Sequence, residues 1–246
     1  MTFSMLNKRF PSLSKYYPEI ASVLVGIVPV FIMIFFFGVS RKIIAKGAIA
    51  YAAGAVGLKL PLYHVLVVKV LHTRLSNTWL GISQGIVSAC SELGASFLFF
   101  LYVVPDLTFA QLVGFGLASG SIEAIILPFM KNPLEGTPLE EHADETLKRS
   151  EGKGAVQWLG VVERIMATCI HIASRGLVYI SYSTGNIFPA LFAFAGFASI
   201  DGRAYFAHLE KWRFDEIRVV GRFYRYMGTI TAVMVFLFVL IFYYGM

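Results

Sequence analysis

Charged residues are scarce in this 246-residue chain: Asp, Glu, Lys and Arg make up only 15% of it, whereas hydrophobic residues make up 57%. The mean hydropathy of +0.69 is too high for a water-soluble domain of this length, which excludes a soluble enzyme. Several stretches of about twenty residues carry one charge or none, and an α-helix of that length crosses roughly 30 Å of hydrocarbon. Because the apolar runs are continuous rather than alternating, we expect an all-α polytopic membrane protein.

Cysteine is nearly absent, and the familiar catalytic motifs are missing. Cys90 and Cys169 lie inside apolar runs, where we expect them to pack as core residues. The chain has no His-Glu-x-x-His, no Gly-x-Ser-x-Gly, no phosphate-binding glycine loop and no Cys-x-x-Cys. The net charge of +6 is typical of the cytoplasmic loops of a membrane protein, so no nucleic-acid partner is expected.

We expect seven membrane-spanning helices. The first covers residues 20–40 and is typical of a signal anchor, because no small-residue cleavage site ends it. The second is interrupted by Lys59 and Pro61, so it should be kinked or partly buried between its neighbours. The six later spans are expected at about residues 47–71, 75–105, 107–130, 155–182, 187–200 and 226–246.

Two polar segments separate these spans. Residues 131–153 hold six acids and four bases and predict a solvated loop with a short polar helix from about Leu139. Residues 203–225 are basic and aromatic and predict a helix in the headgroup layer that binds anionic lipid. The chain therefore divides into a cytoplasmic N-terminus at 1–19, a membrane helix bundle at 20–202, a basic interfacial segment at 203–225 and a last transmembrane helix at 226–246.

The distribution of lysine and arginine predicts the orientation in the membrane. Fifteen of the 21 lie on the side that holds the N-terminus, three lie on the opposite side and three fall within spans. Cytoplasmic loops carry the excess of these residues. We therefore expect an integral protein of the cell membrane with a cytoplasmic N-terminus and, after seven crossings, a C-terminus outside.

Ionisable side chains occur inside four consecutive spans. Each costs roughly 2.5–3.5 kcal/mol at that depth on the mildest scale, so each should face the bundle interior and have a partner. Their distribution predicts one shared polar centre, either as ion pairs that fasten helices together or as a metal or proton-transfer site. The members are Glu92, Glu123, Glu163, Arg164, His171, Arg175 and Asp201.

His171 is the only histidine that lies deep among these acids. Its separation from Glu163 is about 12 Å along one helix, which is too far for both side chains to bind the same ion. A divalent metal such as zinc would therefore take one ligand from each helix, for example His171 together with Glu92, Glu123 or Asp201. One buried histidine is a small ligand set for such an ion.

Short motifs follow one another between residues 20 and 202. They are Lys46-Gly47-Ala48-Ile49-Ala50-Tyr51 with Lys59-Leu60-Pro61-Leu62, then Ser91-Glu92-Leu93-Gly94-Ala95, Gly116 to Ile126, Glu163-Arg164-x-x-Ala167-x-x-x-His171, and Phe197-x-x-x-Asp201. In this order they resemble the YhfC-type membrane peptidases, relatives of the CAAX-prenyl-protease-like and PrsW intramembrane peptidases. The Glu163 to His171 motif matches that family's Glu-Arg-x-x-Ala-x-x-x-His closely.

Four positions depart from the family's pattern. Ser91 and Ala95 stand where the family has a glutamate and an arginine, and Ser119 and Phe197 stand where it has histidines. Phenylalanine cannot bind a metal, and alanine cannot hold a carboxylate in place. Two imidazoles and one Glu–Arg pair of the family's proposed chemistry are therefore missing.

The resemblance implies the fold of the membrane-peptidase superfamily. In an active member, Glu92 or Glu123 would activate water, His171 and Asp201 would bind an ion or orient the base, and Arg164 would balance the charge. The remaining polar residues can also serve structure alone.

Two functions follow from these residues. The substitutions at Ser119 and Phe197 favour a non-catalytic membrane subunit or scaffold that carries no metal and binds other membrane subunits within the lipid bilayer. The alternative is an active intramembrane metallopeptidase-like hydrolase with a divalent metal. A transporter of ions or solutes is a third option, but no pair of broken helices in corresponding halves is evident.

Overall fold

The computed structural model describes residues 16–127, 140–150 and 154–245, and every regular element within them is a helix. The expected all-α fold is therefore confirmed for this part of the chain. Most of the predicted N-terminal segment 1–19 and part of the predicted polar loop 131–153 lie outside the described residues.

The helices follow one another along the chain with short connections. The first described helix is α2, Tyr17–Phe35. A second helical run consists of α3 (Arg41–Tyr51), the π-helix η2 (Ala52–Lys59), α4 (Leu60–Leu62) and the π-helix η3 (Tyr63–Leu71). The later helices are α5 (Asn77–Tyr102), α6 (Phe109–Ile126), α7 (Glu140–Ser150), α8 (Gly154–Thr184), α9 (Phe188–Leu209) and α10 (Ile217–Gly245).

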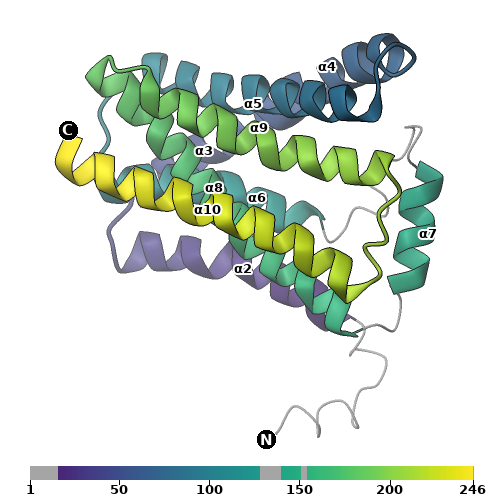
Figure 1. The fold of residues 1–246 in the computed structure, drawn as a ribbon. Coiled ribbons are helices and arrows are strands. Elements are labelled where there is room, and N and C mark those ends of the chain that lie inside the picture. The colour runs from purple at the N-terminus through teal and green to yellow at the C-terminus, as the bar shows by residue number, and fades with distance from the viewer. Residues whose placement is uncertain (1–15, 128–139, 151–153, 246) are drawn as a thin grey trace, which may run out of the picture.

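Among the residues that the structure describes, five helices are long and apolar enough to cross a membrane: α2, the run Arg41–Leu71, α5, α6 and α10. These helices are consistent with the expected membrane protein with several transmembrane helices. The helices at the expected fifth and sixth spans, α8 and α9, are not among the five. They nevertheless lie alongside the other long helices (Figure 1), and α8 carries Glu163, Arg164 and Arg175 along its length.

The second helical run continues through Lys59 and Pro61 without a break. Pro61 lies in the short α-helical turn Leu60–Leu62, where its missing N–H leaves one carbonyl without the usual donor. In the π-helices on either side the backbone bonds reach five residues back: the Leu60 N–H donates to the Ala55 carbonyl, and the His72 N–H donates to the Val67 carbonyl at 2.9 Å. The Lys59 side chain is partly buried, which agrees with the expectation.

The segment 203–225 is not the single predicted helix, because it contains a turn between two antiparallel helices. Helix α9 continues to Leu209, and α10 already begins at Ile217. Between them, Lys211 has a φ of +52°, which no helix interior adopts. The Arg213 guanidinium donates to Asp215 at 2.9 Å, so an ion pair within the turn stabilises the reversal of the chain.

The long helices lie side by side, and α7 lies across the end of the bundle where α9 ends and α10 begins (Figure 1). Helix α2 starts at this same end, whereas α10 ends at the opposite one. Glycines allow α6 to lie close to α8: a Cβ added to Gly116 or Gly120 would come within 2.6 or 2.7 Å of backbone atoms of α8. This close contact allows Glu123 of α6 to reach Arg164 and His171 of α8.

An apolar core fills the end of the bundle opposite α7, beyond the charged residues. The Phe100 ring packs against Phe115 and Tyr179, with centroid distances of 4.9 and 5.3 Å, and Leu177 is fully buried beside them. Tyr179 lies one helical turn beyond Arg175 on α8. This core therefore separates the charged interior from the end of the bundle opposite α7.

Candidate functional site

The first of two buried ionic networks joins α6, α8 and α10. The Nε2 atom of His171 lies 2.7 Å from Oε2 of Glu123, and the second oxygen of Glu123 accepts a bond of 2.6 Å from Arg164. Arg164 also pairs with its neighbour Glu163, whose other oxygen accepts a 3.0 Å bond from the Tyr224 hydroxyl. His171 is only 3% exposed. The chain of contacts runs from this buried imidazole toward the half-buried Glu163.

The second network joins η2, α5, α8 and α9. The fully buried Arg175 donates to Glu92 at 3.0 Å, and Lys59 donates to the other oxygen of Glu92 at 3.0 Å. Lys59 also donates to Asp201 at 2.9 Å, and the Ser88 hydroxyl donates to the same oxygen of Asp201. Glu92 is thus held between two cations, and Lys59 bridges two acids from different helices.

The two networks come closest along α8, where His171 and Arg175 are one helical turn apart. Phe197 of α9 lies against both of them: its ring centroid is 5.7 Å from that of His171 and 5.4 Å from the Arg175 guanidinium carbon. The Tyr51 ring meets His171 edge-on at 5.6 Å. Aromatic rings therefore pack around the imidazole at the point where the networks meet.

The charges of the two networks nearly cancel. Four carboxylates, those of Glu92, Glu123, Glu163 and Asp201, face three permanent cations, Lys59, Arg164 and Arg175, and each carboxylate contacts at least one of these cations. Such pairing is what burial demands, because an unpaired charge in a low-dielectric interior is strongly unfavourable. Each of these four carboxylates is therefore part of an ion pair.

The donor set does not fit a divalent metal. Among the described residues, no group of three or more His, Cys, Asp and Glu side chains lies close enough to hold an ion. Both oxygens of Glu123 already have partners, and the only imidazole here, that of His171, has its Nε2 on Glu123 and leaves its Nδ1 buried with no partner. Guanidinium and ammonium groups beside the carboxylates would also repel a cation.

The predicted polar residues are all found in these two networks, but not in one shared centre. Glu123, Glu163, Arg164 and His171 belong to the first network, and Glu92, Arg175 and Asp201 belong to the second. The two predicted metal ligands, His171 and Asp201, therefore have different partners.

Sequence reasoning missed three members: Lys59, Ser88 and Tyr224. Lys59 offered a signal, because a lone cation inside an apolar run requires a carboxylate partner. Ser88 and Tyr224 offered none, since serine and tyrosine are common in membrane helices.

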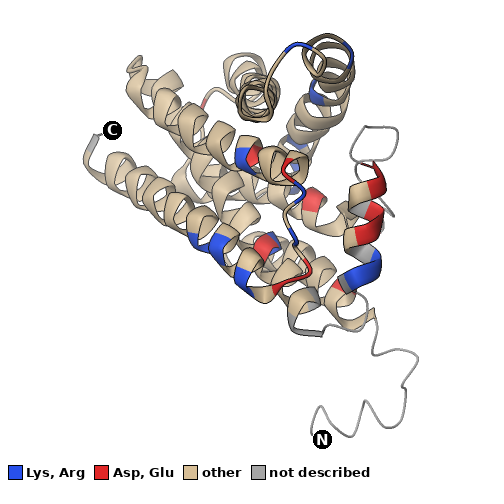
Figure 2. Cartoon of the chain, turned by 45° about the vertical axis from the view of Figure 1, so that its right-hand side comes forward, with Lys and Arg blue, Asp and Glu red and all other residues tan. Residues whose placement is uncertain are grey.

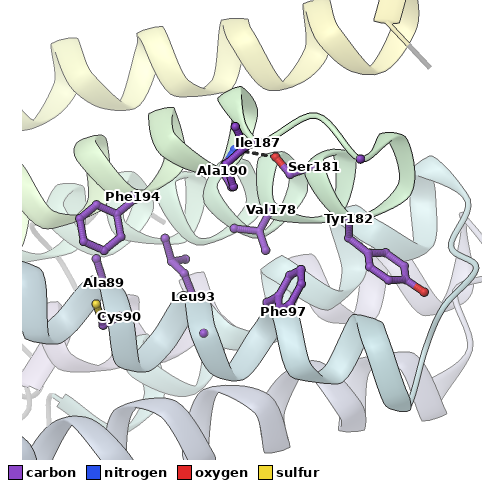
Figure 3. Close-up of a pocket in the computed structure, with 12 residues that line it drawn as sticks. Ala89, Cys90, Leu93, Phe97, Val178, Ser181, Tyr182, Ile187, Ala190 and Phe194 are labelled. Carbon is purple, nitrogen blue, oxygen red and sulfur yellow. Dashed lines mark hydrogen bonds between the residues drawn. The ribbon is translucent and has the colours of Figure 1, made fainter.

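An apolar groove lies between α5 and α9, with α8 as its floor, and has a volume of about 570 Å³ (Figure 3). At the α7 end of these helices, Gly81 and Gly202 bring the two backbones together. Farther along, Leu93, Phe97 and Phe194 line the opening. Gly94 faces open space, with no atom within 4 Å of a Cβ placed there. None of the charged residues of the two networks lines this groove.

Comparison of the chain with protein-family models, with curated proteins and with solved structures finds no match.

Proposed function

We propose that this chain is a non-catalytic integral membrane protein, a subunit or scaffold of a membrane complex, with the fold of the YhfC-type membrane peptidases. One observation carries the proposal: each carboxylate at the positions of the resembling motifs is held by lysine or arginine. The Phe197 ring also packs against both His171 and Arg175. Together these contacts occupy the acids and surround the imidazole that a hydrolase would use.

A general base must be within reach of a water molecule and free to accept its proton. Glu92 is held by Lys59 and Arg175 and is 2% exposed, so both of its oxygens contact cations and neither is open to water. The same contacts join η2, α5 and α8. Glu92 is therefore better suited to holding helices together than to catalysis.

Two of the departures from the family's motifs, Ser119 and Phe197, lie on helices that contribute contacts to His171. Ser119 is one turn before Glu123 on α6, and its hydroxyl donates to the Gly47 carbonyl at 3.2 Å. Gly47 is one turn before Tyr51, whose ring touches His171. Phe197 contacts His171 directly. One position where the family has a histidine, Phe197, thus contacts His171, and the other, Ser119, lies on the helix that carries its partner Glu123, which supports the interpretation of a metal site that has lost its ligands.

The membrane topology is part of this proposal. We propose that α8 and α9 complete seven crossings of the cell membrane, because they run alongside the five apolar helices (Figure 1). The end that holds α7, the start of α2 and the α9–α10 turn would face the cytoplasm, since it carries most of the lysine and arginine. The C-terminus would then lie outside.

The test is to purify the full chain from its native membrane and to determine its metal content and its co-purifying chains. We expect less than stoichiometric zinc both in wild type and in Glu123→Gln, and a fixed set of membrane proteins with wild type. Glu145→Gln, on the exposed face of α7, is the matched control. Stoichiometric zinc that is lost in Glu123→Gln but kept in Glu145→Gln would contradict the proposal.

The active peptidase remains a second candidate because of one contact, the 2.7 Å pair of His171 and Glu123. An imidazole beside a carboxylate is the arrangement of a general acid–base pair. This candidate predicts that His171→Ala abolishes cleavage of a membrane substrate while the protein still folds. Cleavage that survives His171→Ala, or a wild-type protein that cleaves nothing, would rule it out.

A further inference from the structure

Three arginines form an exposed basic face at the start of α10. Arg218, Arg222 and Arg225 are spaced four and three residues apart, so they share one side of the helix. Val220 and Phe223 point to the opposite side and are buried. Figure 2 shows basic positions along this part of α10. The arginines therefore face away from the protein core.

The acids closest in sequence are already paired with other residues. Arg213 binds both Asp215 and Glu216, and Glu210 accepts a bond from the Asn77 side chain at 2.9 Å. Within the described part of the chain, no ion pair joins Arg218, Arg222 or Arg225 to an acid. This basic face thus carries three positive charges that have no ion-pair partner among the described residues.

Aromatic side chains and a fourth arginine lie beside this face. The guanidinium carbon of Arg203 on α9 is 4.8 Å from the Trp212 ring centroid and 5.7 Å from that of Tyr226. The Tyr226 hydroxyl donates to the Ser199 carbonyl at 3.3 Å, which ties α10 to α9 here. Tryptophan and tyrosine with an apolar body and a polar edge are typical of the level where headgroups meet hydrocarbon.

The basic face also lies at the end of α10 where this helix would pass from water into the bilayer. Helix α10 is one of the five helices apolar enough to cross a membrane, and its arginines occur only in its first turns, at the end of the bundle next to α7. Beyond Tyr226 the helix carries no charged residue. In a membrane-spanning α10 the three guanidinium groups would lie where the helix leaves the hydrocarbon, at the depth of the lipid phosphates.

We propose that Arg218, Arg222 and Arg225 form a binding site for the phosphate groups of anionic lipids, with Arg203 and its aromatic neighbours at its edge. Guanidinium groups suit this ligand because their planar donors match phosphate oxygens. The site does not depend on whether the buried networks are catalytic. It takes lipid rather than soluble phosphate because the neighbouring surface of α10 is apolar and faces the acyl chains.

The experiment measures lipid adducts of the detergent-solubilised full chain by native mass spectrometry. The probes are phosphatidylglycerol, phosphatidylcholine and inorganic phosphate. The variant is Arg218→Gln with Arg222→Gln and Arg225→Gln. The matched control removes three other exposed cations that lie in no ion pair, Arg41, Lys42 and Arg74, by the same change to glutamine.

We expect phosphatidylglycerol to bind more tightly than phosphatidylcholine, and the triple variant to lose roughly a hundredfold in affinity, since each basic residue near an anionic surface contributes about fivefold. The control cations are divided between the start of α3 and the residues after η3 rather than gathered on one helix face, so the control should lose far less affinity than the triple variant. Salt should weaken binding to wild type even if the triple variant fails to fold. Equal loss in the control, equal binding of phosphatidylcholine, or inorganic phosphate binding as tightly as the lipid would overturn the proposal.

Discussion

Arg175 shows most clearly how single side chains hold this protein together. Its guanidinium is fully buried and is balanced by Glu92 at 3.0 Å, with the Phe197 ring on its other side. Burying such a pair stabilises a protein little, but removing one partner leaves an uncompensated charge. The buried charged residues are therefore more sensitive to substitution than their exposed counterparts.

We expect Arg175→Met to lower the free energy of unfolding by about 3 kcal/mol, because Glu92 loses one of its two cations in a site without water. Arg149→Met, which breaks the exposed pair with Glu145, should change it by less than about 1 kcal/mol. Thermal unfolding in detergent compares the two variants. Equal effects would mean that the buried network contributes no more than a surface pair.

Two substitutions test whether the site around His171 has lost metal ligands. Ser119→His together with Phe197→His places two imidazoles on the helices that pack around His171, and three imidazoles are a common zinc set. We expect the double variant to bind zinc, measured by elemental analysis after dialysis, while wild type stays below stoichiometric content. Ser121→His with Phe194→His, on the same two helices, is the control. A double variant with no more zinc than this control would argue against the decayed site.

At the scale of helices, the sequence predicts most of the spans well and fails where polar residues lie inside them. The third and fourth spans are bounded by charges and prolines, and α5 and α6 lie within the expected limits. Helix α9 runs on to Leu209 because Asp201 binds Lys59 and Arg203 packs on Trp212, so neither residue needs to leave the helix. Hydropathy cannot foresee such partners, because they come from distant parts of the chain.

The contact between α7 and α9 predicts a dependence of stability on pH. His142 on α7 and His208 near the end of α9 lie with ring centroids 6.2 Å apart, and the Phe214 ring packs on the other side of His208. Burial, and next the neighbouring His142, lower the pKa of His208 from 6.5 to about 4, while Glu163 on α8 acts in the opposite direction. His208 lies in the last turn of α9, beyond the expected span at residues 187–200 and outside the five candidate membrane spans.

Because the folded chain binds this proton more weakly than the unfolded chain, the stabilising contribution is complete above pH 6.5 and is lost as the pH falls toward 4. Between pH 7.5 and 5 we expect a loss of about 2 kcal/mol in the free energy of unfolding. His208→Gln should remove most of this loss, and His64→Gln, an exposed histidine, should leave it unchanged. Hydrogen exchange of α7 at both pH values gives the readout, and an unchanged pH dependence in His208→Gln would contradict the assignment.

At the scale of the whole molecule, the sequence predicts which polar residues are buried but not how they divide into two networks. The division depends on how each helix is rotated and how closely it packs. Gly116 and Gly120 bring α6 against α8, which gives Glu123 to His171 and Arg164. Lys59 forms ion pairs with Glu92 and Asp201 instead, in the second network. Each of these contacts joins residues far apart in the chain, so the hydrophobic periodicity of the sequence cannot predict it.

The proposed topology makes a prediction at this same scale. Helix α2 begins and α10 ends at opposite ends of the bundle (Figure 1), so the two described ends of the chain should face opposite sides of the membrane. A reporter fused to the C-terminus should be active only outside the cytoplasm, and one in the α9–α10 turn only inside it. A cytoplasmic C-terminal reporter would contradict both the orientation and the odd number of crossings.

The contacts of Lys59 bear on how the chain is made. Its ammonium group rests on Glu92 and Asp201, and Asp201 leaves the ribosome long after Lys59 does. Before Glu92 follows, 33 residues later, the lysine has no acid partner and costs roughly 2.5–3.5 kcal/mol at membrane depth. We therefore expect the second helical run to reach its final position during synthesis only after α5 has joined it, and to gain its contact with Asp201 when α9 follows.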